Sequence, residues 1–249
     1  MIDLVRAELL KIRTVRSWYV YLGLIVLFSA IAVAADTGSS TSDERSTLSF
    51  QVGLVQYAGI ATLFAILLGI TIVTTEFRHG TVTPAFLVEP RRERVLAAKV
   101  LAATIVALFF DLLWLAVVAA VGLTWLSIIG ADIHLVDGEI AKAAAETLLT
   151  VVLWALMGIA IGSAVHSQVA ALVGTLVWIF VLENLLWGLF ALLDIDGAVA
   201  YLPFRALDAA DGTGGERLLS YGAGIAVSLA WIASIGAAGL FRTLRRDIT

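Results

Sequence analysis

Two acidic residues and one amide stand in apolar surroundings, where charged groups are costly. Asp111 falls near the middle of one long apolar run, and the neighbours Glu183 and Asn184 fall near the middle of another. Because an ionised Asp costs roughly 3 kcal/mol at the centre of a membrane helix, both carboxyls must face protein or water. Three roles are open to them: a protonated, hydrogen-bonded structural carboxyl, an acid lining a path for cationic or polar amphiphiles, or a proton relay.

A second region of distinct chemistry is the charged segment 75–99, which follows the second apolar run. It carries eight charged residues, and an apolar cluster with Phe86 and Leu87 at its centre lies between Pro84 and Pro90. Proline suits the first position of a helix and disfavours helical conformation in the residue before it. The sequence therefore predicts a short helix here. Its exposed apolar residues, rimmed by charge, predict a contact with a protein or a membrane.

Several other chemistries are excluded or disfavoured by the residue types present. The chain has no cysteine, which excludes disulfides, thiolate metal sites and cysteine nucleophiles. The glycine-rich stretch 211–216 (DGTGGE) lacks the lysine of a phosphate-binding loop, so we expect no nucleotide site and no cofactor on this chain. His79, His134 and His166 lie in three different loops, so we expect no metal site and no enzyme activity.

The elements that must position these residues are membrane helices. Of the 249 residues, 61% are hydrophobic and 14% are charged, against about 25% charged in an ordinary soluble domain. A helix needs about 20 apolar residues to cross a hydrocarbon core of about 30 Å. Six such runs can be read, at 18–35, 53–75, 97–127, 143–165, 169–193 and 219–241. The sequence predicts an all-α membrane protein with six transmembrane helices, in which residues 1–249 form one domain.

The distribution of basic residues predicts the orientation of these helices, because short loops rich in Lys and Arg are retained in the cytoplasm. One side of the predicted spans has twelve such residues: Arg6, Lys11, Arg13, Arg16, Arg78, Arg91, Arg92, Arg94, Lys99, Arg242, Arg245 and Arg246. The other side has four: Arg45, Lys142, Arg205 and Arg217. We therefore expect both termini, and the segment 75–99, in the cytoplasm, and residues 201–205 in an outer loop.

The N-terminal segment has the pattern of a helix that lies on the membrane surface. Ile2, Val5, Leu9 and Ile12 recur at spacings of three and four residues, which places them on one helical face. The basic residues of this segment can reach lipid phosphates. We expect an interfacial helix, and a positively charged anchor without a distinct helix is the alternative.

Four stretches together resemble the ABC-2 type permease subunits of ABC transporters. They are residues 8–13 (ELLKIR), 76–81 (EFRHGT), 90–99 (PRRERVLAAK) and 201–203 (YLP), in a chain with six predicted spans. The resemblance covers essentially the whole chain, and the segment 76–99 is its most specific part. The later spans match in hydropathy alone.

In that family the loop after the second span holds a coupling helix that docks on a separate ATPase subunit, and an acidic residue at the end of that span helps to relay the movement of the ATPase. The resemblance therefore implies that coupling depends on Glu76, Arg78, Gly80, Phe86 and Leu87. It implies two cytoplasmic ATPase chains that carry ATP and Mg, a second permease subunit that is identical or related, contacts with membrane lipid, and no nucleic-acid partner.

The function implied by this resemblance is ATP-driven export of an amphiphile, such as a drug, peptide or lipid-like molecule, across a bacterial cytoplasmic (inner) membrane. Asp111, Glu183 and Asn184 are then candidates for the substrate path. Two alternatives come from other classes. One is a self-contained secondary transporter in which Asp111 and Glu183 are the proton sites, and the other is a membrane sensor or scaffold without transport. An adjacent gene for a P-loop ATPase favours the permease, whereas transport by this chain alone in a proton gradient favours the secondary transporter.

Overall fold

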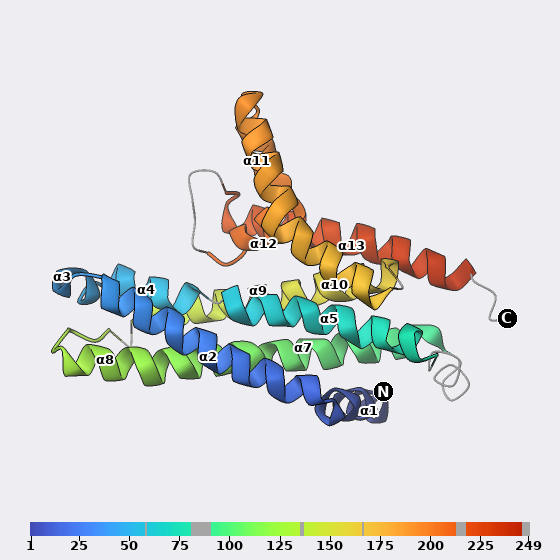
Figure 1. Ribbon diagram of the computed structural model, residues 1–249, viewed down its shortest axis with the longest axis horizontal. Coiled ribbons are helices and arrows are strands. Elements are labelled where there is room, and N and C mark those ends of the chain that lie inside the picture. The colour runs from blue at the N-terminus through green and yellow to red at the C-terminus, as the bar shows by residue number, and fades with distance from the viewer. Residues whose placement is uncertain (58, 81–90, 135–136, 166, 213–217, 246–249) are drawn as a thin grey trace.

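The computed structural model describes the chain except for residues 58, 81–90, 135–136, 166, 213–217 and 246–249 (Figure 1). All regular elements in the described residues are helices. They are α1 (Ile2–Thr14), α2 (Arg16–Ser39), α3 (Ser42–Arg45), α4 (Leu48–Gln56), α5 (Gly59–His79), α7 (Arg92–Val117), η1 (Val118–Gly122), α8 (Leu123–Ile128), α9 (Gly138–Ala164), α10 (Gln168–Val177), η2 (Trp178–Leu182), α11 (Glu183–Leu192), η3 (Asp196–Tyr201), α12 (Pro203–Ala209) and α13 (Tyr221–Arg245). The elements η1 and η2 are π-helical and η3 is a 3₁₀-helix.

Six helical stretches are long and apolar enough to cross a membrane, in agreement with the six predicted spans. They are Arg16–Ser39, Leu48–His79, Glu93–Ile128, Gly138–Ala164, Gln168–Leu192 and Tyr221–Phe241. The prediction of an all-α protein with six such helices is therefore confirmed for the described residues. The second of these stretches consists of two helices, α4 and α5, and the third and fifth each contain a π-helical turn.

Local side-chain chemistry sets several helix ends. The hydroxyl of Thr41 accepts from the backbone N–H of Glu44, whose carboxylate accepts from Thr41 N–H in return. Asp137 and Ser167 cap the first turns of α9 and α10 in the same way, by accepting backbone N–H bonds. Because such caps satisfy N–H groups that lack partners within the helix, each helix can begin at a defined residue.

The centre of the bundle is the close packing of α5 against α9. A Cβ atom on Gly158 would collide with the backbone carbonyl of Ile66, and one on Gly69 would collide with the backbone of Ala155. Small residues of this kind let two helix backbones approach in lipid. Around this contact α7 packs against both helices, and α13 packs against α9.

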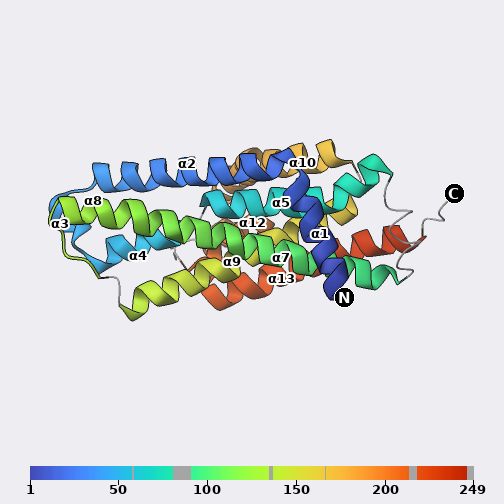
Figure 2. The ribbon, with the colours of Figure 1, turned by 90° about the horizontal axis from the view of Figure 1, so that it is seen from below.

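One end of the bundle gathers the segments that were predicted to share the cytoplasmic side. The end of α5, the start of α7 and the end of α13 lie there, and α1 crosses the bundle near them (Figures 1 and 2). The predicted short helix around Phe86 and Leu87 falls in residues 81–90, outside the described part of the chain. Its neighbours on both sides, α5 and α7, are described.

The expectation of an outer loop at residues 201–205 is corrected by the structure. Pro203 begins α12, the ring of Phe204 lies 5.4 Å from that of Trp154 on α9, and Thr150 of α9 donates to the carbonyl of Ala210. Trp154 is about 24 Å along α9 from its first residue at 1.5 Å per residue. The segment therefore packs beside the middle of α9, held there by buried aromatic and apolar side chains. Beside it, α11 projects away from the rest of the bundle (Figure 1).

Candidate functional site

Four charged side chains from three helices form a closed set of ion pairs at the end of the bundle where α1 lies. Lys99 of α7 donates to the carboxylates of Glu8, at 3.0 Å, and Glu76, at 2.6 Å. Lys11 of α1 donates to the same two carboxylates, at 2.6 Å for Glu8 and 2.8 Å for Glu76. We call these four residues the inner charge cluster. It joins α1 to the end of α5 and the start of α7.

The inner charge cluster is neutral and mostly buried. The side chains of Lys99, Glu8 and Glu76 are 6%, 8% and 11% exposed, whereas that of Lys11 is 53% exposed. Burial by itself would lower the pKa of Lys11, but its hydrogen bonds to Glu76 and Glu8 outweigh burial and raise the pKa above its ordinary value. Two cations and two anions with complementary hydrogen bonds satisfy the condition under which charges can be buried.

Of these four residues, only Glu76 is predicted from the sequence as a site residue. Lys11 and Lys99 enter the prediction of orientation, and Glu8 lies within a stretch that resembles the permease family. A signal was nevertheless present, because Glu8 follows Val5 by three residues and precedes Ile12 by four. This spacing places the carboxylate on the apolar face of the N-terminal helix. An acid on such a face needs a partner, and Lys99 provides it across 91 residues of sequence.

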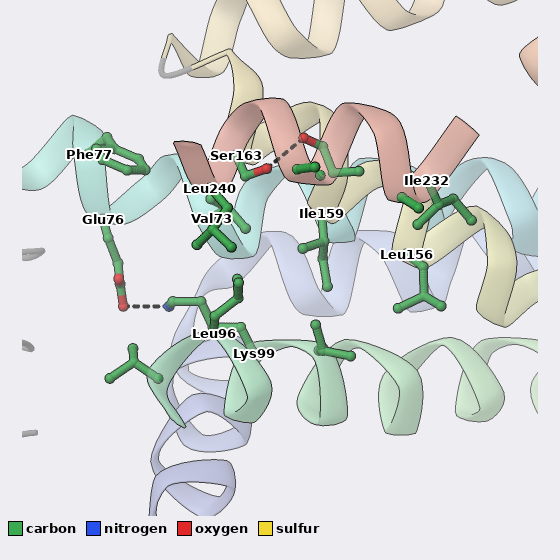
Figure 3. A pocket seen from close by; sticks show the side chains of 16 residues that line it. Val73, Glu76, Phe77, Leu96, Lys99, Leu156, Ile159, Ser163, Ile232 and Leu240 are labelled. Atoms are coloured by element: carbon green, nitrogen blue, oxygen red, sulfur yellow. Dashed lines mark hydrogen bonds and ion pairs between the residues drawn. The ribbon is translucent and has the colours of Figure 1, made fainter. Parts of the chain in front are cut away.

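Beside the inner charge cluster, an apolar groove of about 310 Å³ opens between α7 and α13, with α9 behind it (Figure 3). The side chains of Glu76, Lys99 and Ser163 are its polar members. The rest of the lining is apolar: Val73, Phe77, Val95, Leu96, Val100, Leu156, Ile159, Ala160, Ile232, Ala233, Gly236, Ala237 and Leu240. Figure 3 shows the Glu76–Lys99 ion pair at one end of this groove. The groove therefore combines a long apolar wall with one charged end.

The remaining predicted coupling residues lie near the same end of α5. The guanidinium of Arg78 is exposed and donates to the side-chain oxygen of Gln168 on α10, at 3.3 Å. Gly80 has a φ of +66° and follows the last residue of α5, a left-handed conformation that glycine adopts without steric cost at helix ends. Phe86 and Leu87 lie outside the described residues. Glu76, Arg78 and Gly80 thus stand next to the segment that was predicted to couple.

Asp111 lies deep in the protein, between α7 and α9. It is completely buried, its Oδ2 accepts from the hydroxyl of Thr147 at 3.0 Å, and its Oδ1 has no hydrogen-bond partner among the described residues. A carboxyl in this position contacts protein rather than lipid, as the sequence requires.

Glu183 and Asn184 join α11 to α12. The Oε1 of Glu183 accepts from the backbone N–H of Phe204, at 2.9 Å, and from the indole N–H of Trp178, at 3.1 Å. Asn184 Oδ1 accepts from Arg205, at 3.1 Å. Glu183 therefore satisfies a backbone N–H in the first turn of α12, where a carboxylate is favourable.

The three candidate path residues do not share one set of partners. Glu183 and Asn184 act together on α12, which stacks on Trp154, whereas Asp111 is bound to Thr147, about two helical turns away along α9. Within the described parts of the chain, no group of three His, Asp or Glu side chains is arranged to hold a metal ion. The two features that could serve a function are therefore the buried inner charge cluster, which connects three helices, and the apolar groove with a charged end beside it.

A comparison with curated proteins finds no match. A family model described as "Protein of unknown function (DUF2705)" matches residues 25–249, which include Glu76, Lys99 and the apolar groove but not α1. Because the matched residues make up most of its length, the chain belongs to the DUF2705 family.

Proposed function

We propose that this chain is the transmembrane permease subunit of an ATP-driven exporter of the ABC-2 type. The observation that carries the proposal is the inner charge cluster, Glu8, Lys11, Glu76 and Lys99, at the junction of α1, α5 and α7. In this proposal a separate ATPase, supplied with ATP and Mg, docks on the segment 81–90 from the cytoplasm. No nucleotide chemistry occurs on the chain itself.

The cluster supports a mechanical role because it ties together the two helices that flank segment 81–90. Lys99 lies near the start of α7 and pairs with Glu76 near the end of α5. Glu8 of α1 pairs with the same lysine. Separating a buried ion from its partner costs several kcal/mol. A displacement of the segment by an ATPase would therefore move α5, α7 and α1 together instead of bending one of them.

The groove supports an amphiphilic substrate. Its volume of about 310 Å³ falls at the lower end of the range of roughly 300–1,000 Å³ that small-molecule sites occupy. Glu76 and Lys99 belong both to the cluster and to the groove, so a movement of the cluster would change one end of the groove directly. A molecule with an apolar body and a polar end matches the lining.

Exposed apolar helices support assembly with a second permease subunit. Leu185, Leu189 and Leu192 of α11 are 64%, 47% and 85% exposed, and α11 leaves the bundle (Figure 1). Lipid or a second subunit must cover this surface in a membrane. Two such chains with two ATPase subunits form the proposed exporter of the bacterial cytoplasmic membrane, with both termini of each chain in the cytoplasm.

The test uses the complex of wild-type chain and ATPase in sealed vesicles. Glu76→Gln removes one anion of the cluster while keeping its shape, and we expect the complex to assemble but ATP hydrolysis to lose its coupling to transport. Unchanged coupling would contradict the proposed role. Transport driven by a pH gradient without any ATPase, and lost in both Asp111→Asn and Glu183→Gln, would instead favour the proton-coupled secondary transporter.

A further inference from the structure

We propose that the chain binds one membrane phospholipid in a second groove, along α5 between the α1–α2 elbow and α10, with the lipid phosphate held by Arg78. This groove, which we call the α5–α10 groove, has a volume of about 300 Å³. It lies on the other side of Glu76 from the apolar groove of Figure 3 and shares only that residue with it. The proposal does not depend on the exporter function.

The lining of the α5–α10 groove changes character along its length. Near the end of α5 the lining includes the polar and charged side chains of Lys11, Arg78 and Gln168. Further into the bundle the lining includes Leu68 and Leu172. Arg78 and Leu68 are ten residues apart on α5, which corresponds to about 15 Å along the helix. The groove therefore runs about 15 Å from a charged head region at Arg78 to an apolar end at Leu68, which is the polarity profile of a lipid.

The charges that line the α5–α10 groove favour a lipid with an anionic headgroup. Glu8 and Glu76 also line the groove, but Lys11 and Lys99 neutralise them within the inner charge cluster. Arg78 adds one further positive charge, and its described partner is the neutral amide of Gln168. A guanidinium held in this way fits a phosphate group, which carries one negative charge in a phosphodiester and accepts paired N–H bonds.

The remaining observations favour a lipid over a free anion. Trp18 and Tyr21 line the same groove, and aromatic rings of this kind are enriched where membrane helices meet the headgroup region. The distribution of Lys and Arg predicts that this end of the bundle faces the cytoplasmic leaflet. Basic pockets between membrane helices on that side are suited to phospholipid heads. A free phosphate would leave the apolar part of the groove empty.

The experiment is lipid titration of the purified full-length protein, read by native mass spectrometry. Three probes separate the sources of affinity: dioleoyl phosphatidylglycerol, dioleoylglycerol, which lacks the phosphate, and glycerol 3-phosphate, which lacks the chains. We expect the phospholipid to bind at least about tenfold more tightly than either partial probe, because charged hydrogen bonds and chain burial both contribute.

Three variants locate the site. Arg78→Gln should weaken phospholipid binding by about tenfold or more, and Leu172→Trp should weaken it by filling the apolar region without changing charge. Arg13→Gln removes the same charge from an exposed position on α1 outside the groove and should change binding by less than about twofold.

Retention of the wild-type affinity by Arg78→Gln or by Leu172→Trp would overturn the proposal. Glycerol 3-phosphate binding as tightly as the phospholipid would identify a free-anion site, and equal binding of dioleoylglycerol would identify an unspecific apolar cleft. Either result would also overturn it.

Discussion

Replacing Lys99 with methionine isolates the contribution of the inner charge cluster. The substitution keeps the apolar stem and removes the ammonium group, whose Nζ lies 2.6 Å from Glu76 and 3.0 Å from Glu8. Two buried carboxylates then share only Lys11, which is half exposed. The cluster changes from neutral to a net charge of −1 in an environment that water hardly reaches.

The expected cost follows from this burial. At an effective dielectric constant of about 20, unit charges about 3 Å apart attract by about 5 kcal/mol, and much of this attraction offsets desolvation. Removing one partner of a buried pair costs about 3–5 kcal/mol in measured cases. Because Lys11 remains, we expect Lys99→Met to lower the free energy of unfolding by about 3 kcal/mol. For a chain of this size that corresponds to a fall in the unfolding temperature of roughly 6–12 °C.

The assay is thermal and denaturant unfolding of the purified protein in one detergent, with a double-mutant cycle. Glu8→Gln combined with Lys99→Met restores neutrality, so the double variant should be more stable than the sum of the single effects implies, by about 1–3 kcal/mol. Lys142→Met is the matched control, because Lys142 is 64% exposed and lies 3.7 Å from Glu139. Such a surface pair contributes less than about 1 kcal/mol. Equal effects of Lys99→Met and Lys142→Met would refute the buried cluster.

Two further pairs of substitutions test the packing and the α11–α12 junction. Gly158→Ala should destabilise the fold by about 1–3 kcal/mol, because the added Cβ meets the backbone of Ile66. Gly236→Ala is the control and should not destabilise the fold, because the nearest atom to its added Cβ would be 3.8 Å away. Equal unfolding temperatures of the two variants would refute the close approach of α5 and α9. Glu183→Leu leaves the N–H groups of Phe204 and Trp178 without an acceptor and should cost about 1–3 kcal/mol for each. Glu183→Gln keeps the accepting oxygen and should cost less in the same unfolding measurement, and equal losses would contradict the capping role.

The sequence predicts the six long apolar helices well because the required property is local. The length of an apolar run is set by the thickness of the hydrocarbon core, so the run at 143–165 coincides with the apolar part of α9 (Gly138–Ala164). The start of a helix is also determined locally, since Asp137 caps α9 by accepting the backbone N–H of Glu139, two residues later. No knowledge of the tertiary structure is needed for either.

The candidate site is less predictable because its pairings are distant in sequence. Glu8 and Lys99 meet only when α1 folds across α7, so their individual positions indicate at most a surface helix and a basic loop. The packing of α12 against α9 was missed for a related reason. Its short sequence contains Arg205 and Asp208 and therefore resembles a polar connection. In the structure Arg205 pairs with Asp208 and donates to Asn184. Phe204 packs beside Trp154.

Whether the chain works with a separate ATPase can be seen by purifying it from its native host in a mild detergent and identifying the chains that accompany it. We expect an ATPase with a phosphate-binding loop among these chains, and we expect this ATPase to be lost from the double variant Phe86→Asp, Leu87→Asp. The ATPase should be retained in Arg13→Asp, which changes the charge by the same amount at an exposed position of α1. Absence of any ATPase, or its equal recovery with the double variant, would contradict the claim.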